Sequence, residues 1–244
     1  MIAFRTGCIR IAYKKRDKYP FIAKFNRLNQ MDNKAMEIYR YGNDQASLVL
    51  IQMVGDHELP GLEQEIHEIQ RLSDTDFQLI AVKVNNWNHD LSPWNAKAVF
   101  GKEDFGDGAN DTLEAILKLC SDPDKKYCLG GYSMAGLFAL WAACRTNRFS
   151  GIAAASPSVW FPGFLEDMKH HKIQSNCVYL SLGDKEEKTR NSVMAQVGNC
   201  IREAYAYMNE EGIRCTLEWN RGGHFKDPGL RTAKAFAWVM KMSK

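Results

Sequence analysis

Residues 127–144 read YCLGGYSMAGLFALWAAC, and this stretch decides the fold. The apolar run 127–132 predicts a strand, and the run 134–144, rich in alanine and leucine, predicts a helix that follows Ser133 directly. A sharp strand-to-helix turn of this kind is called a nucleophile elbow, because the hydroxyl at the turn protrudes at the carboxyl end of the strand. The stretch therefore predicts a reactive serine at the edge of an α/β sheet.

The residues two before and two after Ser133 must be small, since the backbones of strand and helix pass close together there. Gly131 and Ala135 meet this requirement, and Gly136 adds further room. The sequence departs from the strict pattern G-x-S-x-G by the methyl group of Ala135. A pattern this short occurs by chance in roughly one chain in five to ten of this length. The flanking strand and helix are therefore what make Ser133 the candidate nucleophile.

Short apolar or β-branched runs alternate with longer runs of helical spacing from about residue 35 onward. Strands are expected at 35–41, 47–54, 77–84, 127–132, 151–155, 178–182 and 215–219. Helices are expected at 62–72, 111–120, 134–144, 192–208 and 230–240. This alternation predicts an α/β fold with a mostly parallel central sheet and helices on both faces, a three-layer sandwich.

The 244 residues fit one α/β domain, and their 45% hydrophobic and 25% charged residues are typical of a globular protein. The net charge of +3 is unevenly distributed, since residues 1–30 hold eight Lys or Arg and one Asp. A basic arm can contact nucleic acid or an anionic membrane, but a solvated extension is the simpler interpretation. We expect a basic N-terminal extension over residues 1–30, a single domain over 31–244, and no nucleic-acid or membrane partner.

The seven cysteines are odd in number and contain no C-x-x-C pair or zinc-type spacing. Reduced, buried thiols are therefore expected, as in a cytoplasmic protein, and no metal site is predicted. No apolar run reaches the roughly 18 residues of a membrane span, and the first thirty residues lack the apolar core of a signal peptide.

A serine nucleophile needs an imidazole that accepts its proton, and in nucleophile-elbow enzymes the base follows the serine in the chain. Of the six histidines, only His170, His171 and His224 follow Ser133. His170 and His171 lie in a charged, helix-like segment typical of a solvated surface. His224 follows Gly222 and Gly223, a turn that can swing a side chain over the sheet edge, so His224 is the expected base.

The acid that orients the imidazole should follow the strand 178–182. Three carboxylates compete in that loop, Asp184, Glu186 and Glu187. Glu186 lies three residues past Gly183, an offset that lets the turn point back toward the histidine. We therefore expect Glu186 as the acid, with Asp184 as the alternative.

Three motifs give the chain a family resemblance: GGYSMAG at 130–136, SLGDKEE at 181–187 and GGHF at 222–225. With these motifs, residues 46–240 resemble the putative-esterase branch of the α/β-hydrolases, which includes enterochelin esterases, S-formylglutathione hydrolase and feruloyl esterases. The resemblance implies an α/β-hydrolase fold, hydrolysis of carboxylic esters or acyl transfer, and no cofactor. It also implies an acid three residues past the glycine, which supports Glu186, although some siderophore esterases act with a Ser–His dyad.

An oxyanion hole is expected to use the backbone N–H of Met134 and a second N–H from the loop after the strand 47–54, where Asp56 is our choice. Trp94 and Trp160 lie in loops that should surround Ser133, so they either wall an apolar substrate pocket or pack those loops against the domain. Arg190 and Arg221 are available as contacts for an acidic substrate.

These residues predict a serine esterase that cleaves a small-molecule carboxylic ester through an acyl-enzyme intermediate. The same groups would also serve a thioesterase or an acyltransferase. A non-catalytic binding protein on the same fold is the alternative of a different class. The sequence makes no prediction about the oligomeric state.

Overall fold

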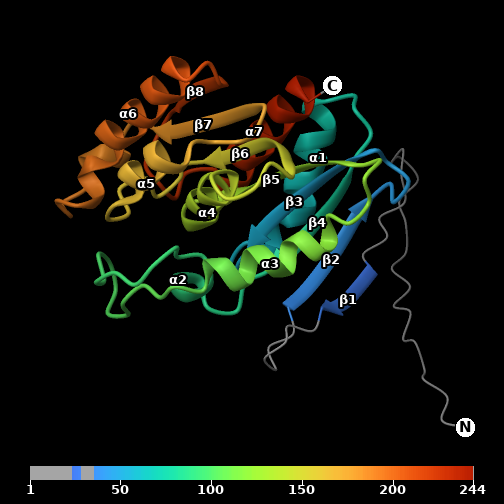
Figure 1. Ribbon diagram of the computed structural model, residues 1–244, viewed down its shortest axis with the longest axis horizontal. Coiled ribbons are helices and arrows are strands. Elements are labelled where there is room, and N and C mark those ends of the chain that lie inside the picture. The colour runs from blue at the N-terminus through green and yellow to red at the C-terminus, as the bar shows by residue number, and fades with distance from the viewer. Residues whose placement is uncertain (1–23, 29–35, 244) are drawn as a thin grey trace, which may run out of the picture.

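The computed structural model describes residues 24–28 and 36–243. Within these residues one sheet has the strand order β1-β2-β4-β3-β5-β6-β7-β8 (Figure 1). Its members are β1 (Lys24–Leu28), β2 (Met36–Gly42), β3 (Leu48–Val54), β4 (Gln78–Lys83), β5 (Lys126–Tyr132), β6 (Phe149–Ala155), β7 (Cys177–Gly183) and β8 (Arg214–Asn220). β1 and β2 pair antiparallel to their neighbours, and β3 to β8 run parallel. The mostly parallel sheet predicted from the sequence is confirmed.

The central strands are mostly apolar because both of their faces are covered. All seven residues of β3 are buried, and so are all seven of β7. The apolar side chains separate into two clusters, one on each face of the sheet. Burial on both faces explains why these strands read as continuous apolar runs rather than as alternating ones.

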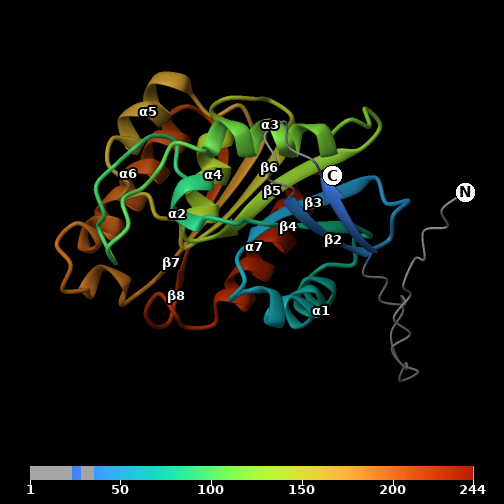
Figure 2. The same ribbon diagram turned by 90° about the horizontal axis from the view of Figure 1, so that it is seen from below.

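The helices divide between the two faces, which gives the three predicted layers. They are α1 (Leu62–Leu72), α2 (Trp87–Asp90), α3 (Ala109–Leu119), α4 (Met134–Ala143), α5 (Phe164–His171), α6 (Val197–Glu210) and α7 (Pro228–Met242), with short 3₁₀ turns η1 (Leu59–Gly61), η2 (Glu186–Lys188) and η3 (Met194–Gln196). Figure 2 shows α1 and α7 on one face and α3, α4 and α6 on the other, in agreement with the two apolar clusters.

Helix α4 lies at the centre of the molecule, and every one of its ten residues is buried. It follows β5 through Ser133 alone, so the nucleophile stands where the middle strand meets the middle helix. The carboxyl ends of parallel strands meet at one edge of the sheet, and the connecting loops there form the usual ligand-binding face of α/β proteins. Ser133 lies at that edge.

β1 lies within residues 1–30, the range expected to be an extension, and its backbone pairs antiparallel with β2. The remainder of the expected extension, residues 1–23 and 29–30, lies outside the described residues. In the described part of the chain no helix is long and apolar enough to cross a membrane. The six cysteines of that part are free thiols, and Cys8 lies outside it.

Candidate active site

Ser133 adopts a strained backbone conformation, with φ of 58° and ψ of −118°. Non-glycine residues at positive φ are uncommon and cluster at functional sites, where the surrounding structure holds them in place. The packing around this turn explains the small neighbours, because a Cβ atom added at Gly131 would lie only 2.5 Å from the Cβ of Ala135. The structure therefore has the strand–turn–helix geometry that the sequence predicted for an elbow.

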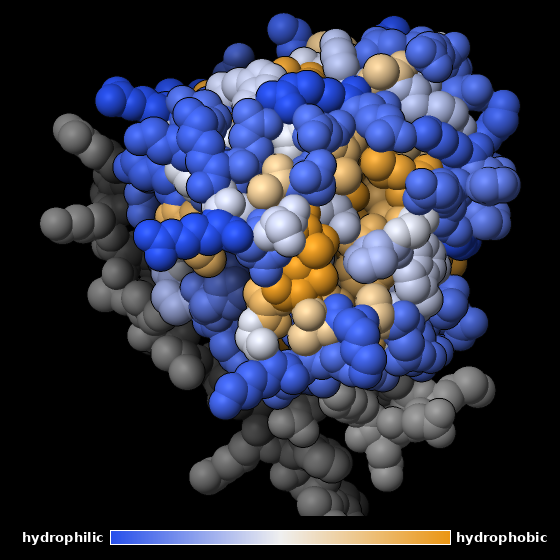
Figure 3. Space-filling view, turned by 90° about the vertical axis from the view of Figure 1, so that its left-hand side faces the viewer, coloured by the Kyte–Doolittle hydropathy of each residue, from blue (hydrophilic) through white to orange (hydrophobic). Residues whose placement is uncertain are grey.

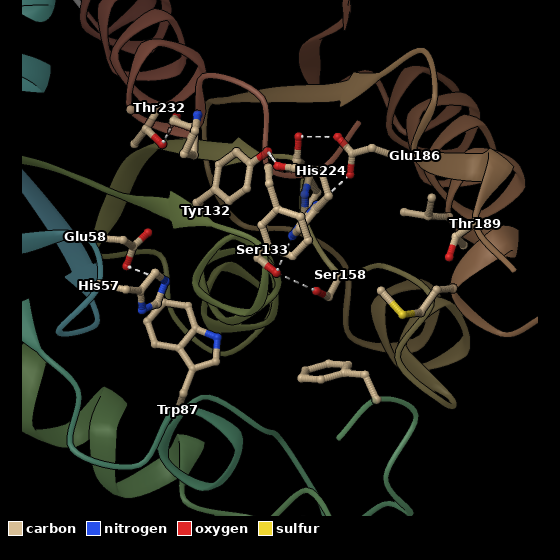
Figure 4. A pocket seen from close by; sticks show the side chains of 18 of the residues that line it. His57, Glu58, Trp87, Tyr132, Ser133, Ser158, Glu186, Thr189, His224 and Thr232 are labelled. Atoms are coloured by element: carbon tan, nitrogen blue, oxygen red, sulfur yellow. Dashed lines mark hydrogen bonds and ion pairs between the residues drawn. The ribbon is translucent and has the colours of Figure 1, made fainter. Parts of the chain in front are cut away.

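The side chain of His224 joins Ser133 to Glu186 (Figure 4). Its Nε2 lies 3.1 Å from the Ser133 Oγ, and its Nδ1 lies 2.7 Å from Glu186 Oε2. The three residues come from three different strand-to-helix connections, after β5, β7 and β8. The structure thus brings together the three residues that the sequence singled out as nucleophile, base and acid.

Glu186 is a buried carboxylate with several donors besides His224. Its Oε1 accepts hydrogen bonds from the Gly183 N–H at 2.7 Å, the Ser156 hydroxyl at 2.9 Å and Arg231 Nη1 at 2.7 Å. Burial alone would raise the pKa of this carboxyl, but the hydrogen bond and charge of His224, with the Gly183 and Ser156 donors, hold it below its ordinary value. Glu186 is therefore ionised at neutral pH.

The two other carboxylates of the same loop have different contacts. Asp184 Oδ1 accepts the backbone N–H of Gly222 at 2.7 Å, so it fixes the turn that precedes His224. Glu187 forms an ion pair with Arg202, at 3.0 Å. Neither carboxylate contacts the imidazole of His224.

A buried arginine that the sequence analysis did not select supports the site from α7. Arg231 is 2% exposed, and its Nη1 donates to Glu186, to the Ser156 hydroxyl and to the Tyr132 hydroxyl. Its Nη2 donates to the carbonyl of Gly223 at 3.0 Å. One signal was present in the sequence, since Arg231 lies among small or apolar residues in the first turns of this helix, PGLRTA at 228–233.

Tyr132 and Ser158 also belong to the site and were missed. The Tyr132 hydroxyl donates to the carbonyl of His224 at 2.5 Å, and burial raises its pKa to about 12, so it remains a donor at neutral pH. The Ser158 Oγ lies 3.3 Å from the Ser133 Oγ, and its N–H donates to the Ser133 carbonyl at 3.1 Å. A single serine or tyrosine carries no sequence pattern that marks such a role.

Backbone donors for an oxyanion are available beside the nucleophile. Met134 is the first residue of α4, so its N–H has no acceptor within the helix. In the loop after β3, Gly55 N–H already donates to Glu58, whereas the amides of Asp56 and His57 make no hydrogen bond to another described residue. The Asp56 side chain is turned away and pairs with Lys83 Nζ at 2.8 Å. His57, which lines the cavity, is thus an alternative to the predicted Asp56 donor.

Ser133 and His224 open into a cavity of about 600 Å³. Trp160, Phe100, Met194 and Val197 contribute its apolar wall. Figure 3 shows the face at the left of Figure 1, where apolar side chains gather in a hollow with hydrophilic residues around it. This side of the molecule is therefore suited to an apolar part of a ligand.

Three of the expected pocket residues lie elsewhere. Trp94 donates its indole N–H to the carbonyl of Pro162 at 2.9 Å and packs against Phe161, so it holds two loops together and does not line the cavity. Arg190 and Arg221 are also absent from its lining. Only Trp160 of the two predicted tryptophans reaches the cavity, because the indole of Trp94 is taken up by loop packing.

Solved structures share this architecture at low sequence identity. Siderophore hydrolase EstA from Aspergillus nidulans is 17% identical, with a TM-score of 0.73 over 97% of this chain and 100% of its own. An IroE-like serine hydrolase from Shewanella oneidensis is 13% identical, with a TM-score of 0.72 over 90% of this chain and 80% of its own. The chain has the α/β-hydrolase fold.

The enterobactin esterase FES from Shigella flexneri is similar over 93% of this chain but only 61% of its own length, with 18% identity and a TM-score of 0.64. No protein-family model and no curated protein matches the sequence. The similarity therefore lies in the fold, and the function has to be argued from the site itself.

Proposed function

We propose that this chain is a serine hydrolase that cleaves a carboxylic ester through an acyl-enzyme intermediate. One observation carries the proposal: the continuous hydrogen-bonded series Ser133–His224–Glu186 at the edge of the sheet. Such a series is recognised by geometry and roles rather than by sequence position, and it activates a serine hydroxyl that is otherwise a weak nucleophile. The cavity beside it leaves room for the substrate.

In the first half of the reaction, the Ser133 Oγ attacks the ester carbonyl while its proton passes to His224 Nε2. Glu186 accepts the Nδ1–H of His224, which fixes the tautomer and stabilises the imidazolium. The N–H of Met134 and a second amide, of Asp56 or His57, stabilise the negative oxygen of the tetrahedral intermediate. His224 then protonates the leaving alcohol, and the acyl group remains on Ser133.

In the second half, water takes the place of the alcohol. His224 accepts a proton from the water as it attacks the acyl-enzyme, and the second tetrahedral intermediate collapses to the acid and free Ser133. The same steps would hydrolyse a thioester. They would transfer the acyl group to an alcohol if the alcohol attacked the acyl-enzyme in place of water. Rates on a para-nitrophenyl ester and on its thioester counterpart, measured side by side, rank these activities.

The substrate class follows from the cavity and from the compared structures. Trp160 and Phe100 supply an aromatic wall, which suits an ester with a sizeable apolar or aromatic group. Siderophore hydrolase EstA and the enterobactin esterase FES share the fold, so we propose siderophore esters as substrates to test first. The buried free thiols Cys128 and Cys177 are typical of a reducing compartment, and we propose a cytoplasmic location on that ground.

Hydrolysis of short para-nitrophenyl esters tests the proposal. The wild type should release para-nitrophenol, and Ser133→Ala should lower kcat by at least about 10³-fold, since removal of the nucleophile from such a series abolishes nearly all chemical catalysis. Equal rates for the two proteins, or no hydrolysis by the wild type of any ester tried, would reject the esterase and favour a binding role for the fold.

A further inference from the structure

A second part of the cavity is lined by carboxyl groups. Glu58, from the loop after β3, and Glu65, on α1, both line the cavity that contains Ser133. Figure 4 shows Glu58 to the left of Ser133, whereas Glu186 lies to the right. The first turns of α7 close this side through Gly229 and Thr232. We call the part of the cavity lined by Glu58, Glu65, Gly229 and Thr232 the acidic lobe.

Glu65 is the most unusual member of the acidic lobe, because it is a buried carboxyl that lacks a full set of partners. Glu65 is only 7% exposed, and its Oε1 has no hydrogen-bond partner in the described structure. The Oε1 of the neighbouring Gln52, which is 1% exposed, also has no partner. Unpaired buried polar groups are costly, so the orphaned Oε1 of Glu65, a residue that lines the cavity, indicates a donor that comes from outside the protein.

The described residues supply no strong cation to these carboxyls. Glu65 has no ion pair, and Glu58 has one distant partner, His57, whose Nε2 lies 4.0 Å away on a side chain that is 71% exposed. Glu58 Oε2 accepts only the backbone N–H of Gly55, at 2.8 Å. The first turn of α7 packs close to this carboxyl, since a Cβ placed at Gly229 would lie 3.4 Å from Glu65 Oε2.

An organic cation fits these carboxyls better than a metal ion does. In the part of the chain that the structure describes, no group of three or more His, Cys, Asp or Glu side chains could hold a metal. An ammonium or guanidinium group, in contrast, brings several N–H donors and a positive charge together. It would satisfy Glu65 Oε1 and pair with Glu58 at the same time, and hydrogen bonds between charged groups are the strong ones.

We propose that the acidic lobe binds a protonated amine or guanidinium group of the ester substrate, so that the enzyme prefers cationic esters over neutral ones. The inference rests on the proposed esterase function and adds a substrate class to it. The apolar wall around Trp160 then receives one part of the substrate, and Glu58 and Glu65 receive the charged part.

Pairs of isosteric esters test this preference. One pair places the charge on the acyl side, on a ring that keeps the amine away from the ester: the para-nitrophenyl ester of trans-4-(dimethylaminomethyl)cyclohexanecarboxylic acid and its analogue in which CH replaces the protonated nitrogen. A second pair places it on the alcohol side: dimethylaminopropyl butanoate and its CH analogue. The two members of each pair have the same size and the same reacting bond. The ratio of their kcat/KM values therefore measures the effect of the positive charge and its N–H donor.

We expect the wild type to prefer the cationic member of at least one pair, and Glu65→Gln and Glu58→Gln each to lower that ratio by roughly 10- to 100-fold. The rate on the neutral ester is measured in the same variant as the reference for the ratio, and far-UV circular dichroism shows that both variants fold. Glu63→Gln is the matched control, because Glu63 lies on the same helix with its side chain exposed. It should keep the wild-type ratio.

The outcomes separate the two proposals. A wild type that hydrolyses the neutral esters as well as the cationic ones in both pairs would overturn the acidic lobe and leave the esterase intact. A cationic preference that persists in both glutamine variants would also overturn it. If no ester is hydrolysed and a fluorophosphonate fails to label Ser133, the esterase proposal is rejected, and the cation-binding proposal that rests on it is rejected as well.

Discussion

The carboxylate of Glu186 decides how well the imidazole of His224 is held. This carboxylate accepts hydrogen bonds from the Gly183 N–H, the Ser156 hydroxyl and Arg231, as well as from His224. A carboxylate bound in this way cannot rotate, so it fixes the Nδ1–H tautomer and leaves Nε2 free to accept the Ser133 proton. Asp184 acts on the same loop through the backbone of Gly222 and has no contact with the ring.

Substitution of Glu186 should therefore lower kcat more than substitution of Asp184. Glu186→Gln replaces the acceptor of the Nδ1 proton with a neutral amide, and we expect kcat to fall by about 10²–10⁴-fold. Asp184→Asn keeps a group that accepts the Gly222 N–H, and its kcat should fall by less than about tenfold. Steady-state hydrolysis of a para-nitrophenyl ester measures both, and a larger loss in Asp184→Asn would reassign the acid.

The pKa of Glu65 predicts an effect on stability that is independent of any substrate. Burial, with the neighbouring Glu58 charge, raises this pKa well above the ordinary value of 4.5. Above pH 4.5 the native state then binds more protons than the unfolded state, so the free energy of unfolding falls as the pH rises toward the native pKa. Glu65→Gln removes this pH-dependent loss of unfolding free energy. The new amide also offers an N–H to the Gln52 Oε1, which has no hydrogen-bond partner in the described residues.

We therefore expect Glu65→Gln to melt at a higher temperature than the wild type at pH 7, by roughly 2–4 °C, which corresponds to about 1 kcal/mol in a chain of this length. The difference should vanish near pH 4. Thermal melts at the two pH values check this, with Glu63→Gln as the control. A variant that is less stable at pH 7 would show that Glu65 is ionised and paired in the free protein.

Among the elements, α7 has a role beyond covering the sheet. Its Arg231 connects the helix to the loop of Glu186 and to the turn before His224, through Gly223. The charge pair Arg231–Glu186 is almost completely buried, with side-chain exposures of 2% and 4%. Removing one partner of a buried pair leaves an uncompensated charge, so the helix and the active-site loops depend on each other.

Arg231→Met should cost about 3–5 kcal/mol of unfolding free energy and lower kcat as well. Arg231→Lys keeps the charge and should recover part of both. Guanidinium chloride unfolding and ester hydrolysis measure the two effects, with Lys241→Met as the control, since Lys241 is exposed on the same helix. If Arg231→Met unfolds like the control, the buried arginine does not hold the site.

The sequence predicted those elements whose patterns are local. Helix 62–72 was predicted with the same bounds as α1, because its apolar face repeats at helical spacing. The last helix begins at Pro228 rather than at residue 230, since proline fits the first helical turn, where its missing N–H is not needed. The helix expected at 192–208 divides into η3 and α6, a break that the apolar spacing did not show.

The site was predictable only where a motif marked it. Ser133, His224 and Glu186 each follow a recognisable strand and a glycine, so chain order alone placed them at one edge. Arg231 was hidden because a single arginine on a helix is usually solvated, and only tertiary packing shows that it is buried. For Trp94 the sequence left open whether it lines a cavity or packs a loop, and the structure shows loop packing.

At the scale of the whole molecule, the sheet brings distant segments together. Ser133 and His224 are 91 residues apart in sequence and within hydrogen-bond distance in space. The parallel order of β5, β6, β7 and β8 makes this possible, because their carboxyl ends share one edge. An apolar wall and an acidic lobe then line the same cavity as the nucleophile.

The most direct test of the central claim is peptide mass spectrometry after reaction with a fluorophosphonate. We expect one adduct, on Ser133, formed at least about 100-fold more slowly in His224→Ala because the general base is lost. An adduct on another residue, or equal labelling of the wild type and Ser133→Ala, would contradict it.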